Sequence, residues 1–364
     1  MRPGIHATLL ASAGLWASGC ELTWSLPDPD RPPGVTNCAG WVQVRRVVQG
    51  GSGASWHHPS DEIVFTALSA DNRFHLHLAD GDFSNARGLT VDPVPGLPDR
   101  NHGIPFWHPS GRFIALNAEK QDHPGDSTPA IPGLGVYVDL WVMAADRSSA
   151  TALTDLPADG RHGVISGQFS PDGTRIAWAE MAAPADATVP AQAFGFWVLK
   201  VGDFLEGPPP RVENVRTFEP GGPAFHELAD WSPDSQKLLF TGSQATANAW
   251  LSQVFLLDLG TGEATQLTDT GYNEHAVFTP DGRQVVWMTN AEATAGTDWW
   301  VMDADGGRKR RLTYLAEPAS PQWTGGSLTV TRANAWSEDG SWFYGDAQPN
   351  LITQSSEIVK VSCP

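Results

Sequence analysis

FSPDGTRIAWAE, residues 169–180, is the stretch that says most about the fold of this chain. Its first part, Ser170-Pro171-Asp172-Gly173, is typical of a tight turn, because proline presets φ and glycine adopts the left-handed conformation that returns the chain. Residues 176–178, Ile-Ala-Trp, are apolar at successive positions, as in a strand that is covered on both faces. The stretch therefore predicts a hairpin inside a stack of packed sheets.

The same arrangement recurs along the chain. Six stretches share an aromatic residue, a polar residue and a turn: Trp56-His57-His58-Pro59-Ser60-Asp61, Trp107-His108-Pro109-Ser110-Gly111, Phe169-Ser170-Pro171-Asp172-Gly173, Trp231-Ser232-Pro233-Asp234-Ser235, Phe278-Thr279-Pro280-Asp281-Gly282 and Trp336-Ser337-Glu338-Asp339-Gly340. A period of about 50 to 60 residues with four strands per unit is typical of propeller blades.

The second half of each unit also recurs. Residues 299–303 predict a third strand, and Leu312-Thr313 marks the end of a fourth; similar pairs are Leu89-Thr90, Leu153-Thr154 and Leu267-Thr268. The third unit has no such pair, and its fourth strand is predicted near residues 212–218. Charge on the outermost strand, as in Lys309-Arg310-Arg311, would protect an exposed sheet edge.

Over roughly residues 41 to 363 these motifs make the chain resemble the TolB-type propeller repeat family. The resemblance implies an all-β fold, a six-bladed β-propeller of four-stranded antiparallel blades over residues 41–364. TolB proteins carry an additional amino-terminal α/β domain, and the motifs found here do not include it. The resemblance therefore implies the fold, and it does not imply a role in the Tol-Pal envelope system.

The last unit predicts how the ring closes. Residues 331–336, 341–347 and 356–362 give three strands, and residues 42–48, which precede the first unit, are the candidate for the fourth. An N-terminal strand that completes the last blade leaves no open edge. Trp323 is an alternative start for this blade; Trp336 is preferred because Trp342-Phe343-Tyr344 makes the better second strand.

The amino terminus predicts export. Residues 1–19 combine Arg2, an apolar run over residues 5–16 that is too short to span a bilayer, and small residues before Cys20. This arrangement resembles a bacterial lipobox, in which Cys20 is lipidated, although Ala17 stands where leucine is commonest and an ordinary cleaved signal peptide is the alternative. Residues 20–40 are rich in proline and predict a tether. We expect a periplasmic or outer-membrane-anchored lipoprotein, bound to the membrane through its lipid alone.

Two further cysteines, Cys38 and Cys363, flank the predicted propeller. In an oxidising compartment they are expected to form a disulfide that acts as the clasp of the ring. The alternative is a pair of free thiols.

The predicted turns place the longest loops on one face of the ring. These are residues 120–135, 181–193, 243–250 and 291–297. Long loops on a rigid scaffold often bind ligands. The alternative is neutral sequence change, because surface loops tolerate insertions.

Polar residues also precede the innermost strands, where they would ring the mouth of the central channel. The candidates are His102, His162, His226, Glu227, Asn273, Glu274, His275 and Glu317. Imidazoles and carboxylates that converge could hold a divalent metal such as Zn²⁺ or Mn²⁺, or a small polar ligand. The alternative is that a hydrated channel mouth needs polar residues for solvation alone.

Composition and missing motifs narrow the function. With 23 Lys and Arg against 41 Asp and Glu, the net charge of -18 disfavours nucleic acid as a partner. No Gly-x-Ser-x-Gly elbow and no dedicated cofactor motif is present. We therefore expect a monomeric binding or scaffold module for an envelope protein or a small polar or saccharide ligand. The alternative is a metal-assisted polysaccharide lyase or hydrolase, by analogy with propeller lyases that act on pectin fragments with histidine-bound metal.

Overall fold

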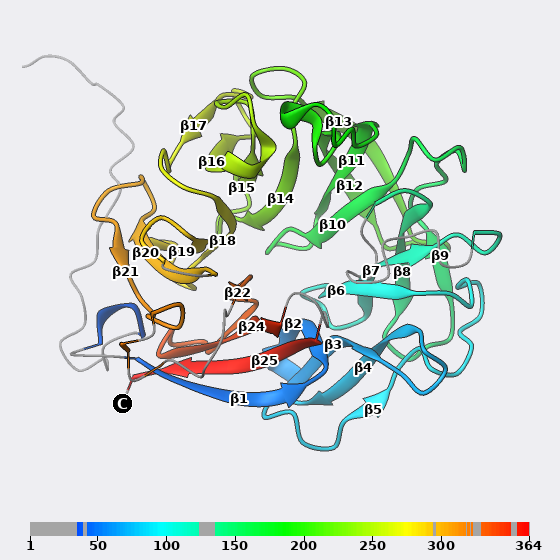
Figure 1. The fold of residues 1–364 in the computed structure, drawn as a ribbon. Helices are drawn as coiled ribbons and strands as arrows, with labels where there is room; N and C mark the ends of the chain where they lie inside the picture. Colours follow the sequence, from blue (N-terminus) through cyan, green and yellow to red (C-terminus); the bar gives the residue numbers. More distant parts are fainter. Residues whose placement is uncertain are drawn as a thin grey trace, which may run out of the picture. The chain divides into compact units, whose positions relative to one another are not determined.

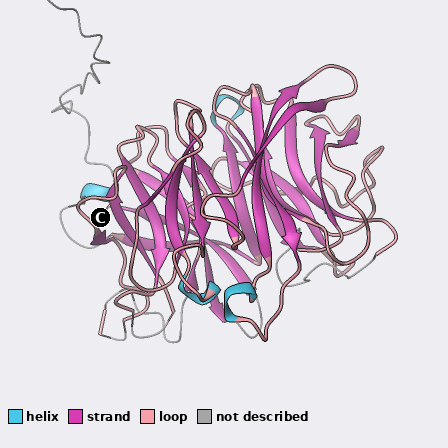
Figure 2. Ribbon diagram, turned by 90° about the horizontal axis from the view of Figure 1, so that it is seen from above, coloured by secondary structure: helices cyan, strands magenta, loops and turns pink. Residues whose placement is uncertain are grey.

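The chain forms a ring of six antiparallel sheets. The computed structural model describes residues 35–38, 42–123, 135–293, 296–317, 319–320, 322, 329–350 and 355–363. Strands β1 to β25 make the six sheets, which are arranged as blades around a central axis (Figure 1) and stand side by side when the ring is viewed from its edge (Figure 2). The predicted all-β six-bladed propeller is confirmed. The predicted signal peptide and Cys20 lie outside the described residues.

Blades one to five each contain four strands that are consecutive in the sequence. From the innermost strand outward, blade one contains β2 (Gly51–His57), β3 (Glu62–Leu68), β4 (Phe74–Asp80) and β5 (Arg87–Gly88), and blade two contains β6 (His102–Trp107), β7 (Phe113–Glu119), β8 (Val138–Ala144) and β9 (Ala150–Ala152). Blade three contains β10 (Val164–Phe169), β11 (Arg175–Ala183), β12 (Phe196–Leu205) and β13 (Arg211–Phe218), and blade four contains β14 (His226–Trp231), β15 (Lys237–Gly242), β16 (Gln253–Asp258) and β17 (Ala264–Gln266). Blade five contains β18 (Asn273–Phe278), β19 (Gln284–Thr289), β20 (Asp298–Asp303) and β21 (Arg310–Arg311). The fourth strand predicted near residues 212–218 is therefore β13.

Blade six joins the two ends of the described chain. Its strands are β22 (Thr329–Val330) and β23 (Ala335–Trp336), which both pair with β24 (Trp342–Asn350), then β25 (Ser355–Ser362) and β1 (Gln43–Gln49). β1 lies antiparallel to β25, with Gln43 opposite Ser362, so the predicted closure by an N-terminal strand is confirmed (Figure 1). Trp336 occupies the innermost strand as predicted, whereas the alternative, Trp323, lies outside the described residues.

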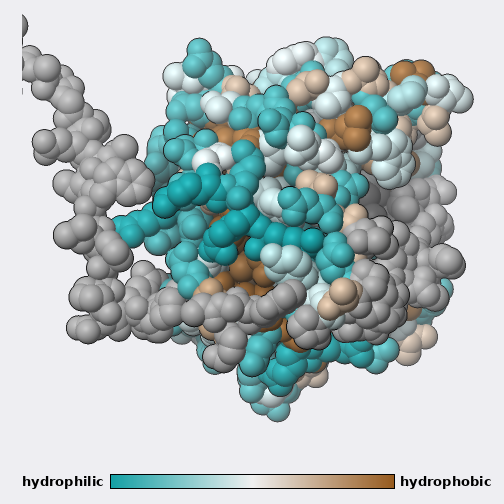
Figure 3. Space-filling view, turned by 60° about the vertical axis from the view of Figure 1, so that its left-hand side comes forward, coloured by the Kyte–Doolittle hydropathy of each residue, from teal (hydrophilic) through white to brown (hydrophobic). Residues whose placement is uncertain are grey.

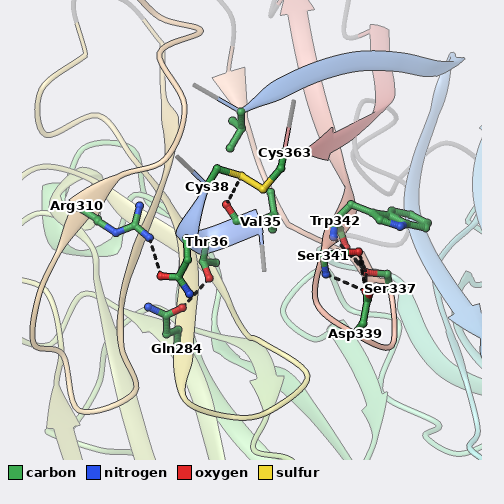
Figure 4. Close-up of a disulfide and its surroundings, with 12 residues drawn as sticks. Val35, Thr36, Cys38, Gln284, Arg310, Ser337, Asp339, Ser341, Trp342 and Cys363 are labelled. Atoms are coloured by element: carbon green, nitrogen blue, oxygen red, sulfur yellow. Dashed lines mark hydrogen bonds between the residues drawn. A yellow bond between two sulfur atoms is a disulfide. The ribbon is translucent and has the colours of Figure 1, made fainter. Parts of the chain in front are cut away.

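A disulfide joins Cys38 to Cys363 across a sequence separation of 325 residues, as predicted (Figure 4). Cys38 follows the short 3-10 helix η1 (Val35–Asn37), which packs on the ring: the Val35 side chain is fully buried, and Thr36 Oγ1 donates a hydrogen bond to Gln284 Oε1 at 2.6 Å. Residues 35–38, at the end of the predicted tether, thus belong to the propeller body.

The repeated turn is held by its own side chains. Ser170 Oγ donates to Asp172 Oδ1 at 2.6 Å, and the same carboxylate oxygen accepts the Thr174 N–H at 2.9 Å. Gly173 has a φ of 72° and donates its N–H to Ser170 O, which reverses the chain. A hydroxyl also donates to the aspartate in the turns of the last three blades: Ser232 to Asp234, Thr279 to Asp281 and Ser337 to Asp339.

The recurring Leu-Thr pair has a physical role. Directly after a short fourth strand, the threonine hydroxyl accepts the N–H of a residue in the third strand, at 2.8 to 3.0 Å: Thr90 from Leu76, Thr154 from Leu140, Thr268 from Val254 and Thr313 from Trp299. The leucine packs in the apolar layer between blades; Leu89, Leu267 and Leu312 are buried. The pair therefore continues the sheet by a side-chain bond where the fourth strand stops.

The interior consists of apolar layers between neighbouring blades, with fully buried side chains that include Trp299 and Phe343. On the side that carries blade five, the described surface is mainly hydrophilic (Figure 3). The predicted basic edge is the outermost strand of this blade, β21. Among the described residues, no helix has the length and apolar character needed to cross a membrane.

Candidate functional site

The innermost strands around the axis are irregular. β2, β6, β10 and β18 each have a register shift against the next strand, and a residue of positive φ lies at each shift: Gly53, Ile104, Ser166 and His275. β14 has a shift between Leu228 and Asp230. Such bulges turn side chains away from the regular alternation and occur often beside functional sites. A positive φ is strained for a β-branched residue such as Ile104. Because backbone strain of this kind clusters at functional sites, the bulges direct attention to the innermost strands.

Three predicted residues converge where blades four and five meet. Glu227 on β14 and Glu274 and His275 on β18 each offer one ligand atom, and these three atoms lie within 4.8 Å of one another. His275 Nε2 is 3.3 Å from Glu274 Oε2. Glu227 and Glu274 are 9% and 8% exposed. We call these three residues the central cluster.

Two hydroxyl groups orient the carboxyl groups of the central cluster. Ser166 Oγ, at the bulge of β10 in blade three, donates to Glu227 Oε1 at 3.2 Å. Tyr272, just before β18, donates its hydroxyl to Glu274 Oε2 at 2.7 Å. Side chains from three consecutive blades therefore fix the positions of the two carboxyl groups.

Burial controls the protonation of the central cluster. It raises the pKa of Glu227 to about 7; His275 opposes this rise, and Glu274 adds to it. Burial likewise raises the pKa of Glu274 to about 7, against the hydrogen bond from Tyr272. The pKa of His275 is lowered, chiefly by burial. Near neutral pH each carboxyl group is therefore only partly ionised, whereas ordinary glutamates are fully ionised there.

A second polar group, the Arg332 group, contains Arg332, Asp230 and Asp346. Arg332 lies between β22 and β23, and its guanidinium is 3.8 Å from Asp230 Oδ1 on β14 and donates to Ala229 O. The guanidinium carbon is also 4.9 Å from the ring centroid of Phe106 on β6. Arg332 of blade six therefore contacts residues of blades two and four.

The aspartates of the Arg332 group accept backbone N–H groups from neighbouring blades. Asp230 Oδ2 accepts from Phe278 N, and Asp346 Oδ2 accepts from Gly53 N, both at 2.9 Å. Burial raises the pKa of both aspartates to about 6, and Arg332 opposes the rise in each. These two bonds thus link blades four and five and blades six and one.

Three other candidates form hydrogen bonds with neighbouring parts of the ring and are not in the central cluster. They occupy the first position of an innermost strand: His102, His226 and Asn273. His102 bonds to Thr90 Oγ1 and Pro98 O at 3.0 and 2.8 Å, and His226 Nδ1 bonds to Trp197 O at 2.7 Å. Asn273 donates to Gln253 Oε1 and accepts from Trp287 Nε1. Burial lowers the pKa of His226, and that of His102 to about 4.

The remaining two candidates lie outside the central cluster. His162 Nδ1 is 2.8 Å from Asp159 Oδ1 on the surface. Glu317 Oε1 accepts from Arg311, whose guanidinium also contacts Asp298. The eight candidates of the sequence therefore divide into three that converge and five that do not.

Five residues of the central cluster's surroundings and of the Arg332 group were not among the predicted candidates: Ser166, Tyr272, Asp230, Arg332 and Asp346. Ser166 and Asp230 are polar residues inside innermost strands, in VISGQF and HELADW, and this position is the signal that could have found them. Arg332 was included in a continuous predicted strand over residues 331–336. In the structure only Ala335–Trp336 of this range form a strand, β23, and Arg332 lies in the irregular segment between β22 and β23.

A separate cavity of about 570 Å³ lies beside the loops of blades one and two. Its lining includes Lys120, His123, Asp139, Trp141 and Asp155. Lys120 forms an ion pair with Asp139, which occupies part of the polar lining. The 120–135 loop, one of the predicted long loops, begins at this cavity, but residues 124–134 lie outside the described part of the chain.

Comparisons with known proteins support the fold. No protein-family model matches the sequence, and no curated protein matches it. Among solved structures, a gluconolactonase from Xanthomonas campestris is similar with a TM-score of 0.55 and 12% identity, over 93% of this chain and 95% of that one. TolB from Acinetobacter baumannii has a TM-score of 0.50 and 15% identity, over 83% of this chain and 65% of the TolB chain. A putative TolB from Agrobacterium tumefaciens has a TM-score of 0.51 and 13% identity, over 75% and 89%.

At these identities the similarity establishes a shared propeller fold. The chain spans just under two thirds of the Acinetobacter TolB. Proteins with different activities share the propeller fold, so the fold alone does not assign a function to this protein.

Proposed function

We propose that this protein is an exported, lipid-anchored propeller of the bacterial cell envelope that binds a small polar ligand at its channel mouth. The observation that carries the proposal is the convergence of Glu227, Glu274 and His275 on one point between two blades. Their donors and acceptors are fixed by a rigid scaffold, which lowers the entropy cost of binding. A binding role fits a site that is rich in hydrogen-bonding groups.

Export is supported by two features. The amino-terminal sequence resembles a lipoprotein signal that ends at Cys20. The disulfide between Cys38 and Cys363 is of the kind that persists in oxidising compartments. The proposed anchor would hold the propeller at the membrane surface.

The anchor is tested by expressing the full chain in a bacterial host and measuring the intact mass of the mature protein. We expect a mass that begins at Cys20 and includes acyl chains, together with partition into the detergent phase. Cys20→Ser is the control and should lose both properties. A wild-type protein that carries no lipid would contradict the anchor.

Ligand binding is tested by calorimetry with neutral oligosaccharides, uronates and small amines. We expect at least one class to bind with 1:1 stoichiometry, and Glu227→Gln or Glu274→Gln to weaken it by roughly tenfold, as for loss of one charged hydrogen bond. His162→Ala, on the surface away from the central cluster, should bind as the wild type does. Binding that is insensitive to both glutamine substitutions would place the ligand elsewhere.

A metal-assisted lyase or hydrolase is the second candidate, and the mixed carboxylate and imidazole donors of the central cluster favour it. In this role the glutamates and His275 would hold the metal, while His102 and His226, which contact neighbouring blades, would not take part. Turnover of an oligosaccharide that requires both added metal and Glu274 would establish catalysis. Metal-independent binding without turnover would favour the binding module.

A further inference from the structure

We propose that Glu227, Glu274 and His275 form a binding site for one divalent transition-metal ion. The proposal rests on the proposed function, because it names the chemical class of a ligand for the same site. The two candidate donors on β18 are adjacent in sequence, and the third comes from β14 in the preceding blade. An ion at this point would join blades four and five.

The spacing of the donor atoms suits a metal ion. Three ligands about 2.1 Å from an ion lie roughly 3 to 3.5 Å from one another. His275 Nε2 and Glu274 Oε2 are already 3.3 Å apart, and all three donor atoms lie within 4.8 Å. A small rotation of the Glu227 side chain would complete the set.

The charges of the described residues leave a place for a cation. Both glutamates are more than nine-tenths buried, and neither forms a salt bridge with a lysine or arginine in the described part of the chain. Arg332, whose charge interacts with that of Glu227, is held by Asp230 and by the carbonyl oxygen of Ala229. A buried carboxylate without a positive partner is costly, and a divalent ion would supply that partner.

The surroundings of the central cluster resemble the outer ligand shell of a metal site. Ser166 bonds to Glu227, and Tyr272 bonds to Glu274, each through one carboxylate oxygen. Hydrogen bonds of this kind orient metal ligands and are as much a part of metal sites as the ligands themselves. Glu227 Oε2 takes no part in the bond from Ser166. Glu274 Oε2 accepts the Tyr272 hydroxyl and is also the oxygen 3.3 Å from His275 Nε2, so it would bind the ion through its other lone pair.

The donor types select the ion. Calcium and magnesium prefer sites made of oxygen donors, whereas an imidazole together with carboxylates suits Zn²⁺ and Mn²⁺. Three protein ligands also leave at least one coordination position for water or for an external ligand. The bound ion could therefore act as the contact point for a polar molecule at the channel mouth.

The test is calorimetric titration of chelator-treated wild-type protein with Zn²⁺ and with Mn²⁺, at neutral pH. We expect one ion per chain, and binding by Glu274→Gln and His275→Ala that is weaker by at least tenfold. His162→Ala is the matched control, since it removes an imidazole outside the central cluster, and it should bind the ion as the wild type does. Wild-type protein that does not bind either ion, or variants that bind as tightly as the wild type, would overturn the proposal.

A second measurement tests the metal site in the wild-type protein, so its result does not depend on whether the variants fold. Crystals of the wild type soaked in Mn²⁺ should give an anomalous peak among the three side chains, and a peak elsewhere or none would overturn the metal site. The failure of the metal site and that of the proposed function are distinguishable. If the wild type binds neither ion but binds a saccharide or an amine in a way that depends on Glu227, the metal site is rejected and the binding module is retained.

Discussion

The guanidinium of Arg332 lies 3.8 Å from the Asp230 carboxylate and joins blade six to blade four across blade five. The side chain of Arg332 is 11% exposed and that of Asp230 is 26% exposed, so the pair is only partly screened by water. Arg332 also opposes the burial that raises the pKa values of Asp230 and Asp346. This single cation therefore stabilises two carboxylates near the axis of the ring.

Arg332→Met should lower the free energy of unfolding by about 3 kcal/mol at pH 7, as expected when one partner of a buried ion pair is removed. Without Arg332 the pKa of Asp230 should rise further. Lowering the pH to 5 would then protonate the carboxyl group and reduce the deficit. Urea unfolding at both pH values measures the effect. The double variant Arg332→Met/Asp230→Asn should recover part of the loss, and an equal deficit at the two pH values would contradict this explanation.

His102 predicts a loss of stability in acid. Its folded pKa of about 4 is below the unfolded value of 6.5, so between these values the unfolded chain binds a proton that the folded chain does not. Stability from this residue is complete above pH 6.5 and is lost as the pH falls toward 4, by about 3 kcal/mol. Glu227 and Glu274, with raised pKa values, have the opposite dependence.

The contribution of His102 is isolated by comparing wild type with His102→Asn from pH 7.5 to 4.5. Because the variant lacks the titrating imidazole, the stability difference between the two proteins should shift in favour of His102→Asn as the pH falls. A constant difference across this range would show that the folded protein protonates His102 as readily as the unfolded chain does.

The disulfide predicts a large and redox-dependent stabilisation. Cys38→Ser and Cys363→Ser should each lower the free energy of unfolding by about 2 to 5 kcal/mol, because the bond restricts an unfolded chain over nearly the whole propeller. Denaturant unfolding with and without reductant measures this. Reduced wild type should resemble the variants, and reductant should not affect either variant. A wild type that is insensitive to full reduction would exclude the clasp.

Replacing Gly173 with alanine should lower the stability of the folded protein for two reasons. At its φ of 72° an alanine is strained, and a Cβ atom would lie 2.8 Å from His108 Nε2 in the neighbouring blade. Gly173→Ala should therefore destabilise by about 2 kcal/mol. Gly262 is the control for backbone strain alone, because its φ is 77° and a Cβ atom there would meet no other atom within 4 Å. Thermal unfolding should rank Gly262→Ala between the wild type and Gly173→Ala, and equal losses would show that the contact with His108 costs nothing.

The architecture of this protein could be predicted from local sequence patterns. Tight turns and apolar strands are local features, so Ser170-Pro171-Asp172-Gly173 and its five counterparts establish where each blade begins. Closure by residues 42–48 followed from the missing fourth strand of the last unit. The pairing of Cys38 with Cys363 followed from their positions on either side of the propeller together with the predicted export.

Which polar residues meet could be learned only from the folded ring. Successive side chains of a strand point to opposite faces, so His226 turns into the contact with blade three while Glu227 approaches Glu274. Bulges alter this alternation around His275, and the irregular segment between β22 and β23 places Arg332 near Asp230. A pattern of residue types identifies the strand, but the position of each side chain depends on bulges and neighbouring blades that no single repeat encodes.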